Sequence, residues 1–213
     1  LDVIFDIDKT LQNQKILEDA GLKPLPVFHV GEDFKHLANY TENYNYIALG
    51  LGGMTGRRAI NNLICWYAKC FEVTKEQVKF HGFAQTSKET LSTFRWYSAD
   101  SSAWSTGGKY GSLPIFDYNF TNQWYVCEIR NRELWQHERI IKYYGFEVED
   151  FIDYGKKSYV KAWQFGAISY WLLEKWLRQF YKNDFNLYMV ALDDKMMKSI
   201  AEGINRFREN NLL

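Results

Sequence analysis

Short apolar runs alternate with amphipathic stretches along the first hundred residues. The runs are rich in β-branched and aromatic residues and are bounded by Gly, Pro or polar residues, which is typical of β-strands. They span residues 1–7, 25–30, 46–51, 78–83 and 96–99. Helical patterns lie between them, at 13–20, at 58–71 and in a short helix after a Thr-Ser-Lys-Glu capping box at 86–89. Strands that alternate with helices through short connections predict right-handed βαβ units and a parallel sheet.

The alternation stops after residue 100. A Ser- and Gly-rich loop and an aromatic-rich, weakly alternating stretch fill residues 101–131, which we interpret as an insertion. Two helices are expected next, then one strand and a terminal helix, at about 133–144, 159–181, 186–192 and 195–208. Because no repeat and no linker interrupts the chain, residues 1–213 are interpreted as a single α/β domain.

The strand count favours an α/β barrel with a part outside this chain. Six parallel strands are predicted, whereas a closed (β/α)8 barrel of the TIM type takes eight. The chain also begins with Leu1 inside an apolar run rather than with Met. We therefore expect a TIM-type barrel whose first strands lie upstream of residue 1.

Composition and charge exclude several classes of protein. Hydrophobic residues make up 46% of the chain and aromatic residues 18%, which excludes a disordered protein. Lys and Arg together number 26, as do Asp and Glu, so a strongly basic nucleic-acid module is excluded. The three cysteines, Cys65, Cys70 and Cys127, form no CxxC pair, and no signal peptide or apolar run of membrane-spanning length is present. A cytoplasmic protein without a membrane span is expected.

Polar and glycine residues lie at the C-terminal ends of four of the predicted strands. The set comprises His29, Gly52-Gly53-Met54, His81-Gly82 and Asp100. The C-terminal ends of barrel strands converge on one mouth, where active sites are built, and glycines allow a planar ligand to approach the backbone closely. Each residue alone has an ordinary structural explanation as a turn former, a cap or a buried histidine. Four such segments on consecutive strands favour a site.

These segments resemble the tRNA-guanine transglycosylases, most closely the short phage-encoded relatives linked to 7-deazaguanine in DNA. In that family an Asp at the end of a D-x5-D strand binds the base, and Asp2 and Asp8 have this spacing. His29 stands where the family has the Gln of a Gln-Gly pair. The resemblance extends from Leu1 to about Gly108.

The later motifs follow in the family's order. Gly52-Gly53-Met54 matches a Gly-Gly-Leu turn that contacts the base, and His81-Gly82 matches a Met-Gly pair. Asp100, followed by Ser101, matches an Asp-Cys pair that supplies the nucleophile. The family's zinc site has no counterpart among the cysteines, and its general-acid Asp is expected upstream of residue 1.

The resemblance implies a glycosyltransferase that exchanges guanine for a 7-deazaguanine in a nucleic acid through a covalent glycosyl-Asp intermediate. Asp100 is then the catalytic residue, and the base-binding residues are Asp8, His29, Gly52, Gly53, Met54, His81 and Gly82. The reaction requires no metal and no cofactor. DNA is favoured over tRNA because the zinc-binding region is missing. The resemblance also allows a homodimer, and a host-cytoplasmic location if a phage encodes the protein.

Two alternatives remain open at this stage. Residues 3–11 resemble the first motif of haloacid-dehalogenase-type phosphatases, in which Asp6 would be the nucleophile and Asp8 the acid/base beside magnesium. Asp193 and Asp194 would then hold the metal and Thr86 the phosphate, although either Asp also suits the N-cap of the last helix. The second alternative is a non-catalytic barrel subunit that binds nucleic acid or a base.

Overall fold

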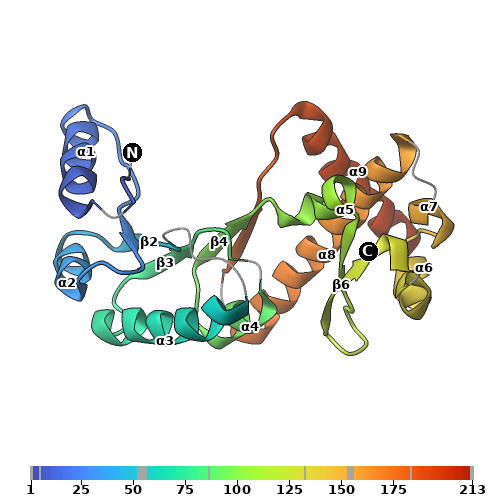
Figure 1. Ribbon diagram of the computed structural model, residues 1–213, viewed down its shortest axis with the longest axis horizontal. Helices are drawn as coiled ribbons and strands as arrows, with labels where there is room; N and C mark the ends of the chain where they lie inside the picture. Colours follow the sequence, from blue (N-terminus) through green and yellow to red (C-terminus); the bar gives the residue numbers. More distant parts are fainter. Residues whose placement is uncertain are drawn as a thin grey trace. The chain divides into compact units, whose positions relative to one another are not determined.

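The computed structural model describes residues 2–4, 6–51, 57–85, 87–131, 133–152, 156–182 and 184–211 (Figure 1). For residues 57–61, 131, 156 and 157 it describes the backbone only. The chain forms two compact units, Leu1–Ala99 and Asp100–Leu213. The interpretation of residues 1–213 as one domain stays a prediction.

The first unit alternates helices and strands. Its elements are α1 (Ile7–Asp19), β1 (Val27–His29), α2 (Phe34–Asn43), β2 (Tyr46–Gly50), α3 (Arg57–Thr74), β3 (Lys79–Gly82), α4 (Lys88–Thr93) and β4 (Ser98–Ser101). Four of the five strands predicted before residue 100 are confirmed, each shorter than or slightly displaced from its apolar run. The helix predicted at 58–71 is confirmed as α3.

The strands form one sheet in the order β1-β2-β3-β4-β7, where β7 is Asn186–Met189. The first three pairings are parallel, with Phe28 opposite Leu49 and His81 opposite Ser98. The α/β class is therefore confirmed. The closed barrel is not: the sheet of the described residues has five strands and two free edges, whereas closure takes eight.

The helices of the first unit follow from the strictly sequential order of its strands. Right-handed crossovers that always add the next strand on the same side leave their helices on one face of the sheet. On α3, Trp66 stacks on Phe28 with ring centroids 5.8 Å apart, and Phe71 lies edge-on to Phe80 at 4.9 Å. Figure 1 shows α3 running along β2 and β3. This face carries the unit's apolar core.

The strand predicted at residues 1–7 is wrong. Among its described residues none is in a strand, and α1 begins at Ile7. The Asp6 carboxylate accepts the backbone N–H of Lys9 at 3.1 Å, and the Thr10 hydroxyl accepts the backbone N–H of Val3 at 2.8 Å. A short polar side chain that accepts one of the first N–H groups of a helix, as Asp6 does for Lys9, favours a helix start over a strand.

Helix α2 was not predicted. Its N-cap, Asp33, accepts the backbone N–H of Lys35 at 2.9 Å, and its buried residues are Leu37 and Tyr40. The cap and the three-residue spacing of these two apolar residues were the available signals. The segment has only ten residues, two of them buried, and lies between two predicted strands, so no helix was predicted there.

The second unit is built around a long helix. Its elements are η1 (Ala103–Ser105), α5 (Thr106–Tyr110), β5 (Ser112–Phe116), β6 (Trp124–Glu128), η2 (Ile129–Asn131), η3 (Glu133–His137), α6 (Glu138–Tyr143), α7 (Glu149–Ile152), α8 (Lys156–Tyr181), β7 and α9 (Asp194–Asn211). The weakly alternating stretch forms an antiparallel hairpin of β5 and β6. Its strands pack on α8, where the Ser169 hydroxyl donates to the Pro114 carbonyl at 2.9 Å. No helix in the described parts of the chain is long and apolar enough to cross a membrane.

Candidate functional site

Strand alternation sends four polar side chains to the same face of β1–β4, opposite the face that α3 covers. They are His29, Tyr46, His81 and Ser98, which we call the polar face. His29 lies opposite Gly50, and His81 lies between Ala48 and Ser98 in the ladder. Because successive strand residues point to opposite faces, these side chains share one face while Phe28 and Phe80 point to the other. All of them except Tyr46 are less than 9% exposed.

His29 is held between two carboxylates. Its Nδ1 lies 3.2 Å from Glu32 Oε1, its Nε2 lies 2.9 Å from Asp2 Oδ2, and its backbone N–H donates to Glu32 Oε2 at 2.8 Å. Carboxylate oxygens only accept hydrogen bonds, so both contacts are satisfied when both ring nitrogens carry protons. The hydrogen bond to Glu32 raises the pKa of His29 above its ordinary value; burial opposes this, and the charges of Glu32 and Asp2 reinforce it.

The contacts of His29 with Glu32 and Asp2 make the stability of the folded protein depend on pH. Because the folded-state pKa of His29 is raised, its stabilisation is fully present below about pH 6.5, the unfolded value, and is lost as the pH rises through the folded-state pKa. We expect Glu32→Gln to reduce this loss. Urea unfolding of the wild type and Glu32→Gln between about pH 6 and pH 9 measures the difference. Equal pH dependence in both proteins would contradict the assignment.

His81 belongs to a chain of hydrogen bonds across three strands. The Ser98 hydroxyl oxygen lies 2.7 Å from His81 Nδ1 and 2.6 Å from the Tyr46 hydroxyl. Ser98 is fully buried. Phe83 lies edge-on to the His81 ring at 4.9 Å. The chain fixes the orientation of His81 on the polar face, and neither Ser98 nor Tyr46 was identified as a site residue from the sequence.

Ser98→Ala is expected to destabilise the first unit by about 1–3 kcal/mol. The substitution removes the hydrogen-bond partner that His81 and Tyr46 share in a buried environment, while the loss of one oxygen leaves little empty space. Chemical denaturation measures the change in the free energy of unfolding. The control is Ser92→Ala on α4, because the Ser92 side chain is less buried than that of Ser98. Its free energy of unfolding is expected to stay within about 0.5 kcal/mol of the wild-type value. Equal effects of the two substitutions would contradict a structural role for the chain.

Asp100 lies in β4, where it is half-buried, and is the first residue of the second unit. Along β4 it alternates with Ser98, so its side chain leaves the strand on the Ser98 side. The strand end is well fixed: the Ser101 hydroxyl accepts the Ala103 N–H at 2.8 Å, and the Ser101 carbonyl accepts the Val190 N–H at 2.9 Å. The structure thus places Asp100 near the end of a parallel strand, where the sequence predicts it.

Two glycines at strand ends are explained by packing. A Cβ on Gly82 would lie 2.7 Å from the Gln85 side chain and 3.1 Å from Trp96. A Cβ on Gly50 would lie 2.6 Å from the His29 ring. Close packing therefore accounts for glycine at both positions. The base-binding role of Gly82 stays a prediction, and Gly50 emerges as the residue that makes room for His29.

The expected position of Asp8 at a strand end is wrong. Asp8 is exposed in the first turn of α1, because Asp6 caps that helix. Its base-binding role stays a prediction. The same observation removes the strand on which the phosphatase alternative depends. Asp193 accepts the Met196 N–H at 2.8 Å, as the N-cap interpretation requires, and Asp194 begins α9.

Several predicted residues lie outside the described residues, namely Gly52, Gly53, Met54 and Thr86. Within the described parts, no group of three or more His, Cys, Asp or Glu residues could hold a metal ion. The cysteines are free: Cys65 is exposed, whereas Cys70 and Cys127 are buried. Burial raises the pKa of the Cys127 thiol to about 11, which makes it a poor nucleophile near neutral pH.

The first unit also contains a cleft of about 810 Å³, lined by residues before β1, β2 and β3 that include Glu18, Tyr44 and Gln77. Tyr44 donates to Glu18 at 2.8 Å across it. This cleft lies at the N-terminal ends of the strands, whereas His29 and Gly82 end β1 and β3. It is therefore separate from the predicted site.

Comparison of the chain with protein-family models, curated proteins and solved structures gives no match.

Proposed function

We propose that the protein is a base-exchange transglycosylase that replaces guanine in a nucleic acid with a 7-deazaguanine. The observation that carries the proposal is the sequential parallel order of β1–β4, in which His29, His81 and Asp100 each lie at or next to a strand's C-terminal end. Parallel strands that add in one direction wind as in an α/β barrel, and such folds build active sites at that end. The proposed complete fold is a TIM-type barrel.

Asp100 is the nucleophile in this proposal. Its carboxylate oxygen attacks C1′ of the target nucleotide, the C1′–N9 bond breaks, and guanine leaves with the bonding electron pair. The corresponding nitrogen of the incoming 7-deazaguanine then displaces the carboxylate from C1′ and loses its proton. Two displacements retain the configuration at C1′, as in retaining glycosidases. A general acid protonates the departing guanine, and no residue of residues 1–213 is assigned to this role.

The base is recognised by polar groups that an adenine cannot satisfy. The Asp8 carboxylate accepts the N1–H and 2-amino hydrogens of guanine, and the backbone of Gly52 and Gly53 with Met54 contacts the ring. The rings of His29 and His81 border the base on the polar face, and Gly82 contributes its backbone. A purine without these two donor hydrogens leaves the Asp8 carboxylate without its hydrogen bonds, so guanine is favoured over adenine.

The polymer is DNA rather than tRNA in this proposal. The reaction takes place in the cytoplasm and requires no cofactor. The proposal is compatible with a homodimer. A duplex substrate must flip its guanosine out of the stack, at a cost of roughly a few kcal/mol. The alternative of a non-catalytic base-binding subunit makes the opposite prediction about turnover.

The test is incorporation of labelled guanine. The protein, together with any sequence that precedes residue 1, is incubated with radiolabelled guanine and either DNA or tRNA, and label in the polymer is counted. We expect label in DNA. Label in tRNA alone would overturn the polymer assignment. Binding of guanine without label in either polymer would overturn the proposed activity in favour of a binding subunit.

A further inference from the structure

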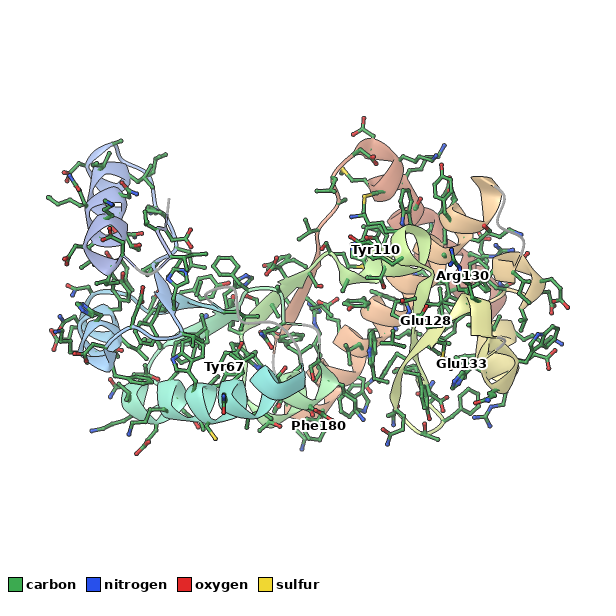
Figure 2. All side chains as sticks on the ribbon, in the orientation of Figure 1. Tyr67, Tyr110, Glu128, Arg130, Glu133 and Phe180 are labelled. Carbon is green, nitrogen blue, oxygen red and sulfur yellow. The ribbon has the colours of Figure 1, made fainter. Side chains whose placement is uncertain are left out.

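A second cleft, of about 200 Å³, lies within the second unit. It is bordered by the end of α5, the start of η2 and the first half of α8. Figure 2 labels Tyr110 and Arg130, which contribute to it from α5 and η2. The proposed base exchange uses none of its residues.

Close backbone packing forms this cleft. Gly108 lies so near α8 that a Cβ would be 2.4 Å from Trp163 Nε1 and 3.0 Å from the Tyr159 carbonyl oxygen. Gly111 ends α5 with a φ of +74°, which glycine adopts without strain, and its carbonyl accepts the Ile129 N–H at 2.9 Å. These contacts bring the last residues of α5 beside Arg130 and beside the Tyr159 turn of α8.

The lining of the cleft is cationic and aromatic. Lys109 and Arg130 line the cleft, and both are exposed. Tyr110 is 76% exposed, an unusual position for a large ring. The Lys195 ammonium lies 4.5 Å from the centroid of the Tyr159 ring and donates to its hydroxyl group, which adds a third positive charge.

We propose that this cleft binds a nucleic-acid strand, with Lys109 and Arg130 on phosphate oxygens and Tyr110 stacked on an unpaired base. Exposed aromatic rings beside cations are the combination with which proteins hold single-stranded nucleic acid. The inference rests on the proposed function for its choice of a nucleic acid over other anions. Gly107, which lines the cleft, and the proposed nucleophile Asp100 belong to the same unit and are seven residues apart in the sequence.

The test of the cations is the salt dependence of binding. Fluorescence anisotropy measures the Kd of a labelled strand of about 20 nucleotides, as DNA and as RNA, between about 50 and 200 mM salt. Each lost phosphate contact lowers the slope of log K against log salt by about 0.7 for single strands. We therefore expect Lys109→Gln/Arg130→Gln to lower the slope by about 1.4. Lys198→Gln, an exposed lysine of α9 outside the cleft, is the control and should leave the slope unchanged.

The test of the ring uses an abasic strand. Tyr110→Ala is expected to weaken binding of the normal strand by at least about fivefold, because stacking is lost, whereas Tyr110→Phe keeps the ring and the affinity. On an otherwise identical abasic strand Tyr110→Ala should have no effect. Because Tyr110 is exposed, the variants should melt at the temperature of the wild type.

The two proposals fail in different ways. Unchanged Kd and slope in the double variant, or no binding by the wild type, would overturn the cleft assignment even if base exchange is observed. Binding that depends on the cleft, without label exchange, would overturn the proposed function and leave the cleft standing. Equal losses on normal and abasic strands in Tyr110→Ala would overturn the stacking role.

Discussion

Asp100→Asn is expected to abolish base exchange, with a loss of at least about a thousandfold in rate. The amide keeps the size of the side chain but lacks the charge that attacks C1′. Guanine binding should persist, because the proposed base contacts lie on other residues. Label incorporation and guanine affinity, measured on the same preparation, separate the two effects.

The matched control for this substitution is Asp194→Asn, an exposed carboxylate in the first turn of α9. It removes one negative charge from the same unit and should exchange guanine at the wild-type rate. Near wild-type exchange by Asp100→Asn would show that the nucleophile is assigned wrongly. A loss of thermal stability confined to Asp100→Asn would instead make its inactivity a folding defect.

Trp96→Ala is expected to lower the free energy of unfolding of the first unit by about 3–5 kcal/mol. Trp96 is fully buried, its ring lies edge-on to Tyr67 at 4.9 Å and to Phe71 at 5.5 Å, and its Nε1–H donates to the Thr90 carbonyl at 3.0 Å. The substitution leaves a large cavity beneath the sheet and removes one of the two hydrogen bonds that the Thr90 carbonyl accepts. Chemical denaturation followed by circular dichroism measures the loss.

Trp135→Ala is the control for cavity formation, since Trp135 is 44% exposed. It is expected to change the free energy of unfolding by less than about 1 kcal/mol. If both substitutions lowered the free energy of unfolding by similar amounts, Trp96 would not be central to the core that supports the polar face.

Much of the sheet could be predicted because its strands are locally distinct. Residues 46–51 and 78–83 are short apolar runs between polar segments, and they contain β2 and β3. The apolar run at residues 1–7 was wrongly predicted to be a strand, because hydrophobicity alone does not show that Asp6 caps a helix by accepting the Lys9 N–H. Local hydrogen bonds decided that segment.

The contacts of the candidate site were less predictable than its positions. His29 and His81 were identified at strand ends, but the sequence does not show that Glu32 and Asp2 hold one ring and Ser98 the other. Asp2 lies 27 residues from His29, and Ser98 lies 17 residues from His81, so these pairs form only when the chain folds. Alternation along the paired strands is the signal that could have linked Ser98 to His81.

The covalent intermediate tests the central claim most directly. The protein is incubated with a DNA strand containing deoxyguanosine and no incoming base, denatured, digested with protease and nuclease, and analysed by mass spectrometry. The proposed mechanism predicts a peptide that carries a deoxyribosyl adduct on Asp100, which disappears when a 7-deazaguanine is added before denaturation. An adduct on another residue, or turnover of guanine with no adduct, would contradict it.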